Sequence, residues 1–226
     1  MTKPPSFCII SIEGNIGSGK STLLAHLKDN LKDDKIIFLK EPVDEWERIK
    51  DENGKTIIEK FYGDQERYSF PFQMMAYISR LSILKETIDK NPDSIIIIER
   101  SLYTDKYVFA KMLYDDGKIE SVNYQIYLRW FETFSLEYPI SKSIYVKADP
   151  ENCYKRIIKR SRDGEDNIPL EYLISCDKYH DEMTNELIKI FQNHKQIKLD
   201  GNIDIYEDKD KLTEWINRIK ELILSD

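Results

Sequence analysis

One short glycine-rich run constrains the fold of this chain more than any other feature. The run has the pattern G-x-x-x-x-G-K-S and lies between a strand-length apolar segment and an amphipathic segment. Its residues, with the one that follows, are Gly14, Asn15, Ile16, Gly17, Ser18, Gly19, Lys20, Ser21 and Thr22. In this pattern, glycines let backbone N–H groups turn inward around an anion, and the helix that begins there favours negative charge. The run therefore predicts a loop that surrounds the phosphates of a nucleoside triphosphate.

Two side chains of the run would act on the triphosphate. Lys20 would reach the β- and γ-phosphates, and the hydroxyl of Ser21 would be a ligand of Mg²⁺. A glycine-rich turn without any ligand is the alternative. The apolar segment before the run and the amphipathic segment after it are the context that phosphate binding requires, and they favour the first interpretation.

Short apolar runs, each too short for a helix, recur along the chain between longer amphipathic stretches. They are Phe7–Ile12, Ile36–Leu39, Ser94–Ile98, Ser143–Val146 and, more weakly, Gln196–Leu199. Continuous apolarity of this kind is typical of strands that are buried on both faces. We therefore expect an α/β fold of the P-loop NTPase type, with a five-stranded parallel sheet flanked by helices and with a lid.

The stretches between these runs are expected to be helical. The expected helices are Ser21–Leu31, Asp64–Lys90, Asp105–Tyr114, Val122–Glu137, Pro150–Lys159, Leu170–Asn193 and Lys209–Leu224. The stretch 45–63 is polar and is expected to be an irregular insertion, and residues 156–167 are the expected lid. At 226 residues, the chain is expected to form one domain over 1–226.

Charge and cysteine content exclude several classes of protein. With 34 Lys and Arg against 41 Asp and Glu, the net charge is −7, which argues against a nucleic acid polymer as partner. The cysteines, Cys8, Cys153 and Cys176, have no metal-ligand spacing, so we expect reduced, incidental thiols. Neither a targeting segment nor a membrane-length apolar stretch is visible, so a cytoplasmic location without membrane contact is expected.

Two carboxylates fall at the ends of predicted strands. Glu41 follows the second strand, and Glu99 with Arg100 follows four isoleucines of the third. Because open α/β sheets bind ligands beyond the carboxyl ends of their strands, Glu41 could orient or deprotonate a hydroxyl there. Glu99 would serve the metal site, and Arg100 would offer a forked donor to the transferring phosphoryl group. The alternatives are a surface charge for Glu41 and a simple ion pair for Glu99 and Arg100.

A local group of arginines surrounds the expected lid. It consists of Arg156, Arg160 and Arg162, of which the first two are four residues apart and share one helical face. In a net-acidic chain such a group suits phosphate. A solvated helix end, in which Lys155 and Lys159 also take part, is the alternative.

The long helix expected at 64–90 carries polar groups among aromatic residues. Gln73 and Arg80 are seven apart on one face, and the apolar residues around them are Phe70, Phe72, Met74, Tyr77 and Leu81. An amide and a guanidinium beside aromatic rings suit a nucleobase, which needs both stacking and edge hydrogen bonds. The same aromatic residues would equally suit a protein core.

Taken together, these motifs resemble the deoxyribonucleoside kinase family, which includes deoxycytidine, deoxyguanosine and mitochondrial thymidine kinases. The resemblance runs from about residue 9 to 179 in matching order. The matching motifs are Ile12-Glu13-Gly14-Asn15-Ile16-Gly17-Ser18-Gly19-Lys20-Ser21, Glu41-Pro42-Val43 with Trp46, Glu66-Arg67-Tyr68-Ser69-Phe70-Pro71-Phe72-Gln73, Glu99-Arg100-Ser101-Leu102-Tyr103-Thr104-Asp105-Lys106-Tyr107 and Ile168-Pro169-Leu170-Glu171-Tyr172-Leu173.

The resemblance implies a role for each matching position. Glu41 would be the base that acts on the substrate 5′-hydroxyl, with Arg100 near the same oxygen and Lys20 as the third catalytic residue. The other implied residues are Gln73 at the base edge, Tyr62 and Glu165 at the sugar 3′-hydroxyl, Trp46, Phe72 and Phe109 around the base, and Arg160 and Arg162 in the lid, with Arg156 in its support.

A preference among bases follows from three further positions. Ala76, Arg80 and Asp105 resemble the deoxycytidine and deoxyguanosine type of arrangement, whereas thymidine-preferring members carry apolar or small residues at the last two sites. The Asp105 carboxylate can accept from an exocyclic amine, and the guanidinium can meet a ring acceptor or a carbonyl. Thymine would place its methyl group against a charge. We therefore expect purine or cytosine deoxynucleosides to be preferred over thymidine.

The reaction implied by the resemblance is transfer of the γ-phosphoryl group of ATP to the 5′-hydroxyl, a step of nucleotide salvage. A homodimer through the helices at 64–90 and 122–137 is also implied. A nucleoside monophosphate kinase is one alternative, but Glu41 would repel the phosphate of its acceptor. A GTPase-type switch is the other, and the guanine-reading Asn-Lys-x-Asp segment that it needs is absent from the sequence.

Overall fold

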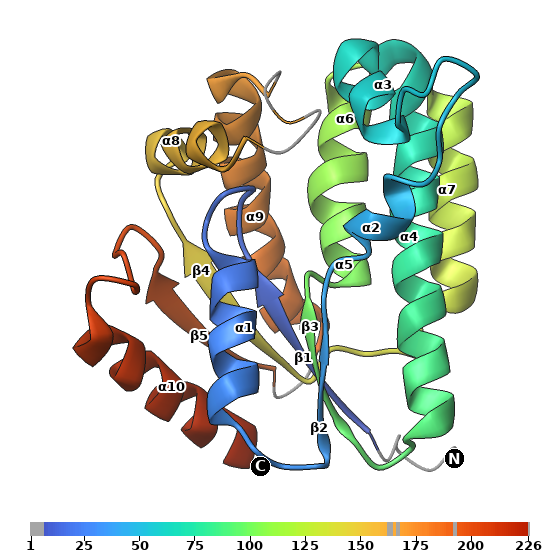
Figure 1. Ribbon diagram of the computed structural model, residues 1–226. Helices are drawn as coiled ribbons and strands as arrows, with labels where there is room; N and C mark the ends of the chain where they lie inside the picture. The colour runs from blue at the N-terminus through green and yellow to red at the C-terminus, as the bar shows by residue number, and fades with distance from the viewer. Residues whose placement is uncertain (1–6, 162–164, 166–167, 192–193, 226) are drawn as a thin grey trace.

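The structure is a computed structural model that describes residues 7–161, 165, 168–191 and 194–225 (Figure 1). Within these residues, five parallel strands form one sheet in the order β2-β3-β1-β4-β5. The strands are β1 Cys8–Glu13, β2 Ile36–Leu39, β3 Ile95–Glu99, β4 Lys142–Lys147 and β5 Lys195–Asp200. Each predicted apolar run overlaps one strand, and the expected α/β fold with a parallel sheet is confirmed.

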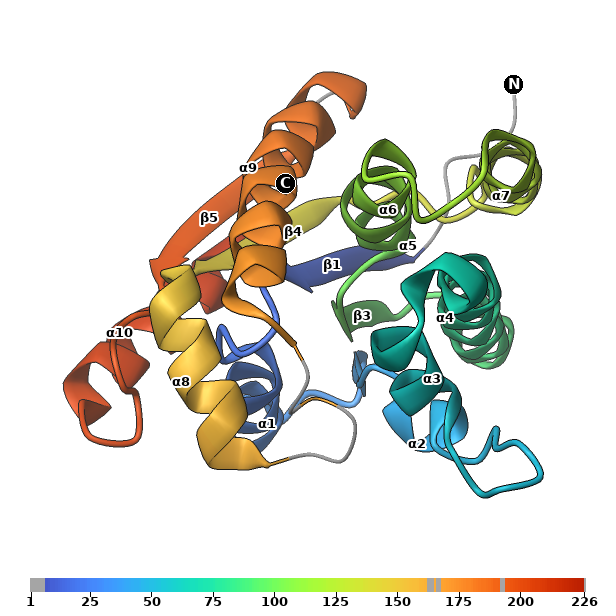
Figure 2. The same ribbon diagram turned by 90° about the horizontal axis from the view of Figure 1, so that it is seen from above.

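Helices cover both faces of this sheet. They are α1 Lys20–Asn30, α2 Val43–Trp46, α3 Ile57–Gly63, α4 Gln65–Lys90, α5 Leu102–Thr104, the π-helical turn η1 Asp105–Ala110, α6 Lys111–Asp115, α7 Ser121–Phe134, α8 Pro150–Arg160, α9 Leu170–Ile190 and α10 Lys209–Leu224. The view from above shows α1 and α10 on one side of the sheet and α4, α6, α7 and α9 on the other (Figure 2).

The apolar strands supply both halves of the core. In β1, Ile10 and Ile12 pack with α1 and α10, whereas Ile9 packs with residues of α4, α7 and α9. Burial on both faces explains why the strands read as continuous rather than alternating apolar runs. The register between β1 and β3 pairs Ile12 with Glu99, so both strands end at the same edge of the sheet. That edge carries the functional side chains described below.

The expectation of an irregular insertion at 45–63 is wrong for part of that stretch. Helix α3 begins there with a capping box: the Thr56 side chain accepts from Glu59 N over 3.1 Å, and the Glu59 carboxylate accepts from Thr56 N over 2.7 Å. Ile58 and Phe61 are buried under this helix. Tertiary burial of two apolar residues therefore stabilises a helix that is too short to be visible as a periodic pattern.

The helix expected at 105–114 begins earlier and is not a regular α-helix. It starts at α5, where Ser101 and Thr104 form the cap, continues through the π turn η1 and ends in α6. π turns are rare and occur frequently at functional sites. Here the turn contains Asp105 and Phe109, two residues that were predicted to contact the substrate.

The expected lid is only partly covered by the described residues. Helix α8 ends at Arg160, and Ser161 follows with a left-handed backbone (φ 47°). Arg162 was predicted to bind phosphate and lies outside the described residues. No helix in the described ranges is long and apolar enough to cross a membrane.

Candidate active site

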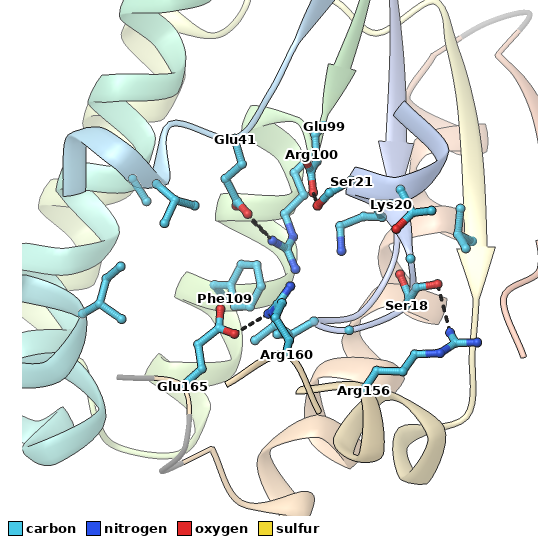
Figure 3. Close-up of a pocket in the computed structure, with 18 of the residues that line it drawn as sticks. Ser18, Lys20, Ser21, Glu41, Glu99, Arg100, Phe109, Arg156, Arg160 and Glu165 are labelled. Carbon is cyan, nitrogen blue, oxygen red and sulfur yellow. Dashed lines mark hydrogen bonds and ion pairs between the residues drawn. The ribbon is translucent and has the colours of Figure 1, made fainter. Parts of the chain in front are cut away.

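A cavity of about 570 Å³ opens at the carboxyl edge of the sheet. The predicted residues that line it are Ile16, Gly17, Ser18, Gly19, Lys20, Ser21, Thr22, Glu41, Trp46, Tyr62, Phe72, Gln73, Ala76, Glu99, Arg100, Asp105, Phe109, Arg156, Arg160 and Glu165. Gly14, Asn15 and Arg80 are described but lie behind its wall. Residues from elements and loops far apart in sequence thus meet around one space, much of which is shown in Figure 3.

The phosphate-binding loop needs glycine at two positions for steric reasons. Gly14 has φ +145°, and a Cβ atom there would lie 2.4 Å from the carbonyl oxygen of Val146. Gly17 has φ +78°, and its Cβ would lie 2.6 Å from the carbonyl oxygen of Cys153 on α8. A side chain at either position would push β4 or α8 away from the loop. Glycine at position 14 therefore lets the loop pack closely against β4, although it does not line the cavity.

Lys20 is held inside the loop that it serves. Its Nζ donates to the carbonyl oxygen of Asn15 over 2.6 Å, and Asn15 Nδ2 donates in turn to the carbonyl oxygen of Leu173 over 2.8 Å. Burial, together with the positive charge of Arg100, lowers the pKa of Lys20 to about 7. An anion placed in the loop would reverse this effect, because it would stabilise the charged ammonium group.

Ser21 and Glu99 form a pair of oxygen ligands beside the loop (Figure 3). Ser21 Oγ donates to Glu99 Oε1 over 2.6 Å, and Glu99 is buried at the end of β3. Mg²⁺ prefers oxygen ligands, keeps several waters and commonly takes one or two protein groups beside substrate phosphates. A hydroxyl and a carboxylate next to a phosphate-binding loop fit that requirement.

Glu41 lies between two guanidinium groups. Arg100 Nη1 donates to both carboxylate oxygens, over 2.9 and 2.7 Å, and Arg80 Nη2 donates to Oε1 over 3.0 Å. Burial alone would raise the pKa of Glu41, but the charges of Arg100, Arg80 and Lys20 lower that pKa to about 2. Glu41 is therefore a fully ionised carboxylate that faces the cavity.

Arg100 is held in an unusual conformation at the start of α5. Its backbone is left-handed (φ 59°), and its N–H donates to the carbonyl oxygen of Ile12 on β1 over 3.0 Å. Its Nε and Nη2 are buried and find no acceptor among the described residues. A strained backbone and unpaired buried donors are features that cluster at functional sites. The arrangement leaves two donor nitrogens for an anionic or hydroxyl-bearing ligand.

Arg80 does not reach the cavity, contrary to its expected contact with the base. Its side chain is 2% exposed and donates to Asp105 Oδ2 over 2.9 Å, to the Glu99 carbonyl oxygen over 2.8 Å and to Glu41. Acceptors on three residues from separate parts of the chain thus hold the guanidinium behind the wall. Burial raises the pKa of Asp105, and the charge of Arg80 opposes that rise. The Asp105 carboxylate itself lines the cavity.

Aromatic rings line one end of the cavity. Trp46 meets Phe72 edge to face, with ring centroids 5.5 Å apart, and Phe72 stacks on Phe61 at 4.7 Å. Gln73 is buried beside them, and its Oε1 has no donor among the described residues. The Arg100 guanidinium lies 5.1 Å from the centre of the Phe109 ring. Flat apolar walls with an unpaired amide oxygen suit a planar heterocycle.

The lid arginines differ in what they contact (Figure 3). Arg160 forms an ion pair with Glu165, and both residues line the cavity. Arg156 Nη1 instead donates to the carbonyl oxygens of Ser18, over 3.5 Å, and of Gly201, over 2.6 Å. Arg156 therefore joins α8 to two loops. Burial and the charge of Glu165 raise the pKa of Tyr62, another residue that lines the cavity.

A family model described as "Deoxynucleoside kinase" matches residues 10–224. The chain belongs to the deoxynucleoside kinase family. This deoxynucleoside kinase is 31% identical to a probable deoxycytidine kinase of fowlpox virus over 217 residues, which cover 95% of this chain and 87% of the relative. It is 32% identical to human deoxycytidine kinase, with 95% of this chain and 90% of the relative covered. A mitochondrial deoxyguanosine kinase of Xenopus laevis is also 32% identical, over 83% of this chain and 78% of the relative.

As a member of this family, the kinase is a nucleotide-binding transferase that phosphorylates a deoxynucleoside with ATP. The two ends of its cavity match two substrates of different chemistry. The glycine-rich loop with Lys20 suits phosphates, and the aromatic end with Gln73 suits a base.

Sequence reasoning missed one wall of the kinase's cavity. It is formed by the loop between β5 and α10 together with one residue of α10, namely Ile203, Asp204, Ile205, Tyr206 and Trp215. Tyr206 packs against His26 of α1, with ring centroids 5.6 Å apart. The loop lies beyond the carboxyl end of β5, where ligands of open α/β sheets bind, and this position could have indicated it. Its polar, aperiodic composition carried no other signal.

Proposed function

We propose that this kinase transfers the γ-phosphoryl group of ATP to the 5′-hydroxyl of a purine deoxynucleoside or of deoxycytidine, in preference to thymidine. The observation that carries the proposal is the buried chain Asp105–Arg80–Glu41, whose two carboxylates face the cavity. Asp105 would contact the base, and Glu41 would contact the hydroxyl. The relatives named as deoxycytidine and deoxyguanosine kinases agree with such a preference.

The base preference rests on the acceptor that Asp105 presents. Its carboxylate oxygens accept from Arg80, over 2.9 and 3.3 Å, and keep further lone pairs for a ligand. An exocyclic amine, as in cytosine or adenine, would donate to it. Guanine would offer ring and amine N–H donors. Thymine has a carbonyl oxygen on C4, where cytosine has its amine, and a methyl group on the adjacent C5, so it would turn an acceptor and a methyl group toward the carboxylate.

In the proposed reaction, Glu41 orients the 5′-hydroxyl and accepts its proton. Arg100 is close enough to place its unpaired N–H groups near the same oxygen, and Lys20 with Arg160 would offset charge on the phosphates. When bound through Ser21 and Glu99, Mg²⁺ would neutralise charge on the β- and γ-phosphate oxygens. Positioning and electrostatic stabilisation carry most of the catalysis in phosphoryl transfer, so a weakly basic Glu41 suffices.

The acceptor is proposed to be a nucleoside, not a nucleoside monophosphate. An acceptor phosphate would need a cationic partner of its own near Glu41. The positive charges of the two arginines there are already balanced by two carboxylates: Arg100 pairs with Glu41, and Arg80 pairs with Glu41 and Asp105. A phosphate at this point would meet an ionised carboxylate at close range. The product would be the 5′-monophosphate, as in salvage of preformed nucleosides.

A homodimer is proposed from one face of α7. Val122, Ile126, Trp130 and Phe134 recur every four residues along this helix and are 58%, 43%, 43% and 41% exposed. Figure 1 shows α7 on the outer side of the molecule beside α4, on which Ile78 is 45% exposed. A stripe of large apolar side chains on a helix is typical of an association surface. A second copy of the chain would bury it.

A coupled assay with two acceptors tests the proposed reaction. Deoxyadenosine and dAMP are supplied separately with ATP and Mg²⁺, and ADP formation is followed. The expected result is turnover with deoxyadenosine that yields its 5′-monophosphate, and little turnover with dAMP. A higher kcat/KM for dAMP would contradict the proposal. Lys20→Met is the control that removes ADP formation with either acceptor if the enzyme itself is the source.

A further inference from the structure

Ser79 holds the indole ring of Trp46 from behind the aromatic end of the cavity. Trp46 Nε1 donates to Ser79 Oγ over 2.8 Å. Both side chains are buried, at 6% and 1% exposure. Trp46 lines the cavity, whereas Ser79 does not. Any effect of Ser79 on a bound base would therefore be transmitted through Trp46.

The hydroxyl of Ser79 is well suited to accept this hydrogen bond. Its oxygen lies 2.8 Å from the carbonyl oxygen of Met75 and 3.1 Å from that of Ala76, so its single hydrogen is directed to the backbone of α4. A hydroxyl with its hydrogen engaged keeps its lone pairs for a donor. The Trp46 N–H is therefore bound to a group that α4 itself orients, one turn after Ala76.

Trp46 needs such a support because its own element is short. Helix α2 has four residues, and so short a helix has little stability of its own. Figures 1 and 2 show α2 beside α4, and the two helices are in contact. Through the edge-to-face contact of Trp46 with Phe72, the position of the indole also affects the ring that stacks on Phe61.

We propose that Ser79 is a positioning residue for base recognition. By fixing the plane of the Trp46 indole, it keeps the aromatic wall in place for the acceptor base and has no part in binding the phosphate donor. This inference rests on the proposal that the base occupies the aromatic end of the cavity. The phosphate-binding end is built from another part of the chain, namely residues 14–21.

The first test compares two matched changes on α4. Ser79→Ala leaves a buried indole N–H without an acceptor, and we expect the KM for deoxynucleoside to rise about 5- to 20-fold and the KM for ATP to stay within about twofold. Thr87→Ala is the control, because Thr87 Oγ1 donates to the Ile83 carbonyl oxygen over 2.8 Å on the same helix, outside the cavity. It should leave both KM values unchanged.

A double-mutant cycle then separates action through Trp46 from a general structural effect. Trp46→Phe keeps a ring but lacks the N–H, so Ser79→Ala should add less than about a twofold change in that background. An equal effect of Ser79→Ala in both backgrounds would overturn the proposal. Parallel increases of both KM values in Ser79→Ala would overturn it as well.

An NMR measurement tests the contact without any turnover. The chain has three tryptophans, so three indole ¹⁵N–¹H signals are expected, and Trp46→Phe assigns one of them. In Ser79→Ala, the Trp46 signal should move upfield and exchange faster with solvent, while the other two stay in place. An unchanged Trp46 signal would overturn the proposed contact. Failure of the proposed base preference would instead appear in the wild-type enzyme, as preference for thymidine.

Discussion

The guanidinium of Arg80 lies 3.0 Å from a carboxylate oxygen of Glu41, and through its Nε it also holds Asp105 at 2.9 Å. One fully buried cation thus connects the carboxylate proposed to read the base with the carboxylate proposed to receive the hydroxyl. Neither carboxylate could remain ionised at this depth without a cation beside it. Arg80 acts on substrates through these two groups, because it lies behind the cavity wall.

The stability of this buried pair can be measured directly. Arg80→Leu leaves Asp105 buried without its cation, so we expect the free energy of unfolding to fall by about 3–5 kcal/mol. In Arg80→Leu/Asp105→Leu neither charge remains, and the loss should be smaller than the sum of the single changes by about 2 kcal/mol. Urea unfolding of the wild-type protein, Arg80→Leu, Asp105→Leu and the double variant gives the coupling free energy between the two side chains. Additive losses would show that the two side chains do not depend on each other.

The role of Glu41 predicts a specific kinetic effect. Glu41→Gln should lower kcat by about 10²- to 10⁴-fold, because the amide cannot accept the hydroxyl proton, while the Kd for ATP changes by less than about threefold. Glu41→Asp keeps the charge and should lose less. Since arginine charges lower the pKa of Glu41 to about 2, its protonation should cause no loss of wild-type kcat/KM as pH falls from about 7 to 5. Unchanged turnover in Glu41→Gln would remove this residue from the reaction.

The lowered pKa of Lys20 leads us to expect that the enzyme takes up protons when ATP binds. Burial and the charge of Arg100 lower its pKa to about 7 in the free enzyme, and phosphates would raise that pKa again. The enzyme should therefore take up about 0.8 proton at about pH 7.5 and about 0.1 proton at about pH 6. Calorimetry in buffers of different ionisation enthalpy measures this uptake.

Lys20→Arg is the control for this measurement, because a guanidinium stays charged throughout the range. It accounts for protons that ATP itself binds or releases. The difference between the two proteins should grow as pH rises from 6 to 8, since more of the free Lys20 is then neutral. Equal uptake by both proteins at every pH would contradict a lowered pKa for Lys20.

The proposed dimer predicts the effect of one surface charge. Trp130→Glu places a carboxylate in the middle of the apolar stripe on α7, where a partner would desolvate it. Sedimentation velocity should show the wild-type protein at twice the mass of one chain and the variant at the mass of one chain. Leu224→Glu on α10 is the matched control, because Leu224 is an apolar residue that is 82% exposed away from α7. A monomeric wild-type protein would contradict the proposal.

Much of the site could be predicted because parallel sheets bring distant residues to one edge. Glu99 ends β3, Arg100 follows it and Glu41 comes soon after β2, so their convergence required only the positions of the strands. The phosphate-binding loop was equally visible, because its glycines meet steric demands that other residues cannot. In both cases the physical constraint is local or follows from topology.

The features that could not be predicted depend on contacts between elements. Helix α3 is stabilised by burial of Ile58 and Phe61, which a short polar stretch does not reveal. The turn of Arg80 away from the cavity depends on acceptors in β2–α2, β3 and η1. Ser79 has no chemistry that distinguishes it in the sequence, and only its distance to Trp46 indicates a role.

A panel of four deoxynucleosides tests the central claim most directly. Deoxyadenosine, deoxyguanosine, deoxycytidine and thymidine are compared as kcat/KM with saturating ATP and Mg²⁺. The predicted result is that the highest kcat/KM belongs to a purine deoxynucleoside or to deoxycytidine, and the lowest to thymidine. In Asp105→Asn, the difference in kcat/KM between the preferred deoxynucleoside and thymidine should be smaller. Thymidine with the highest kcat/KM of the four would contradict the proposed recognition by Asp105.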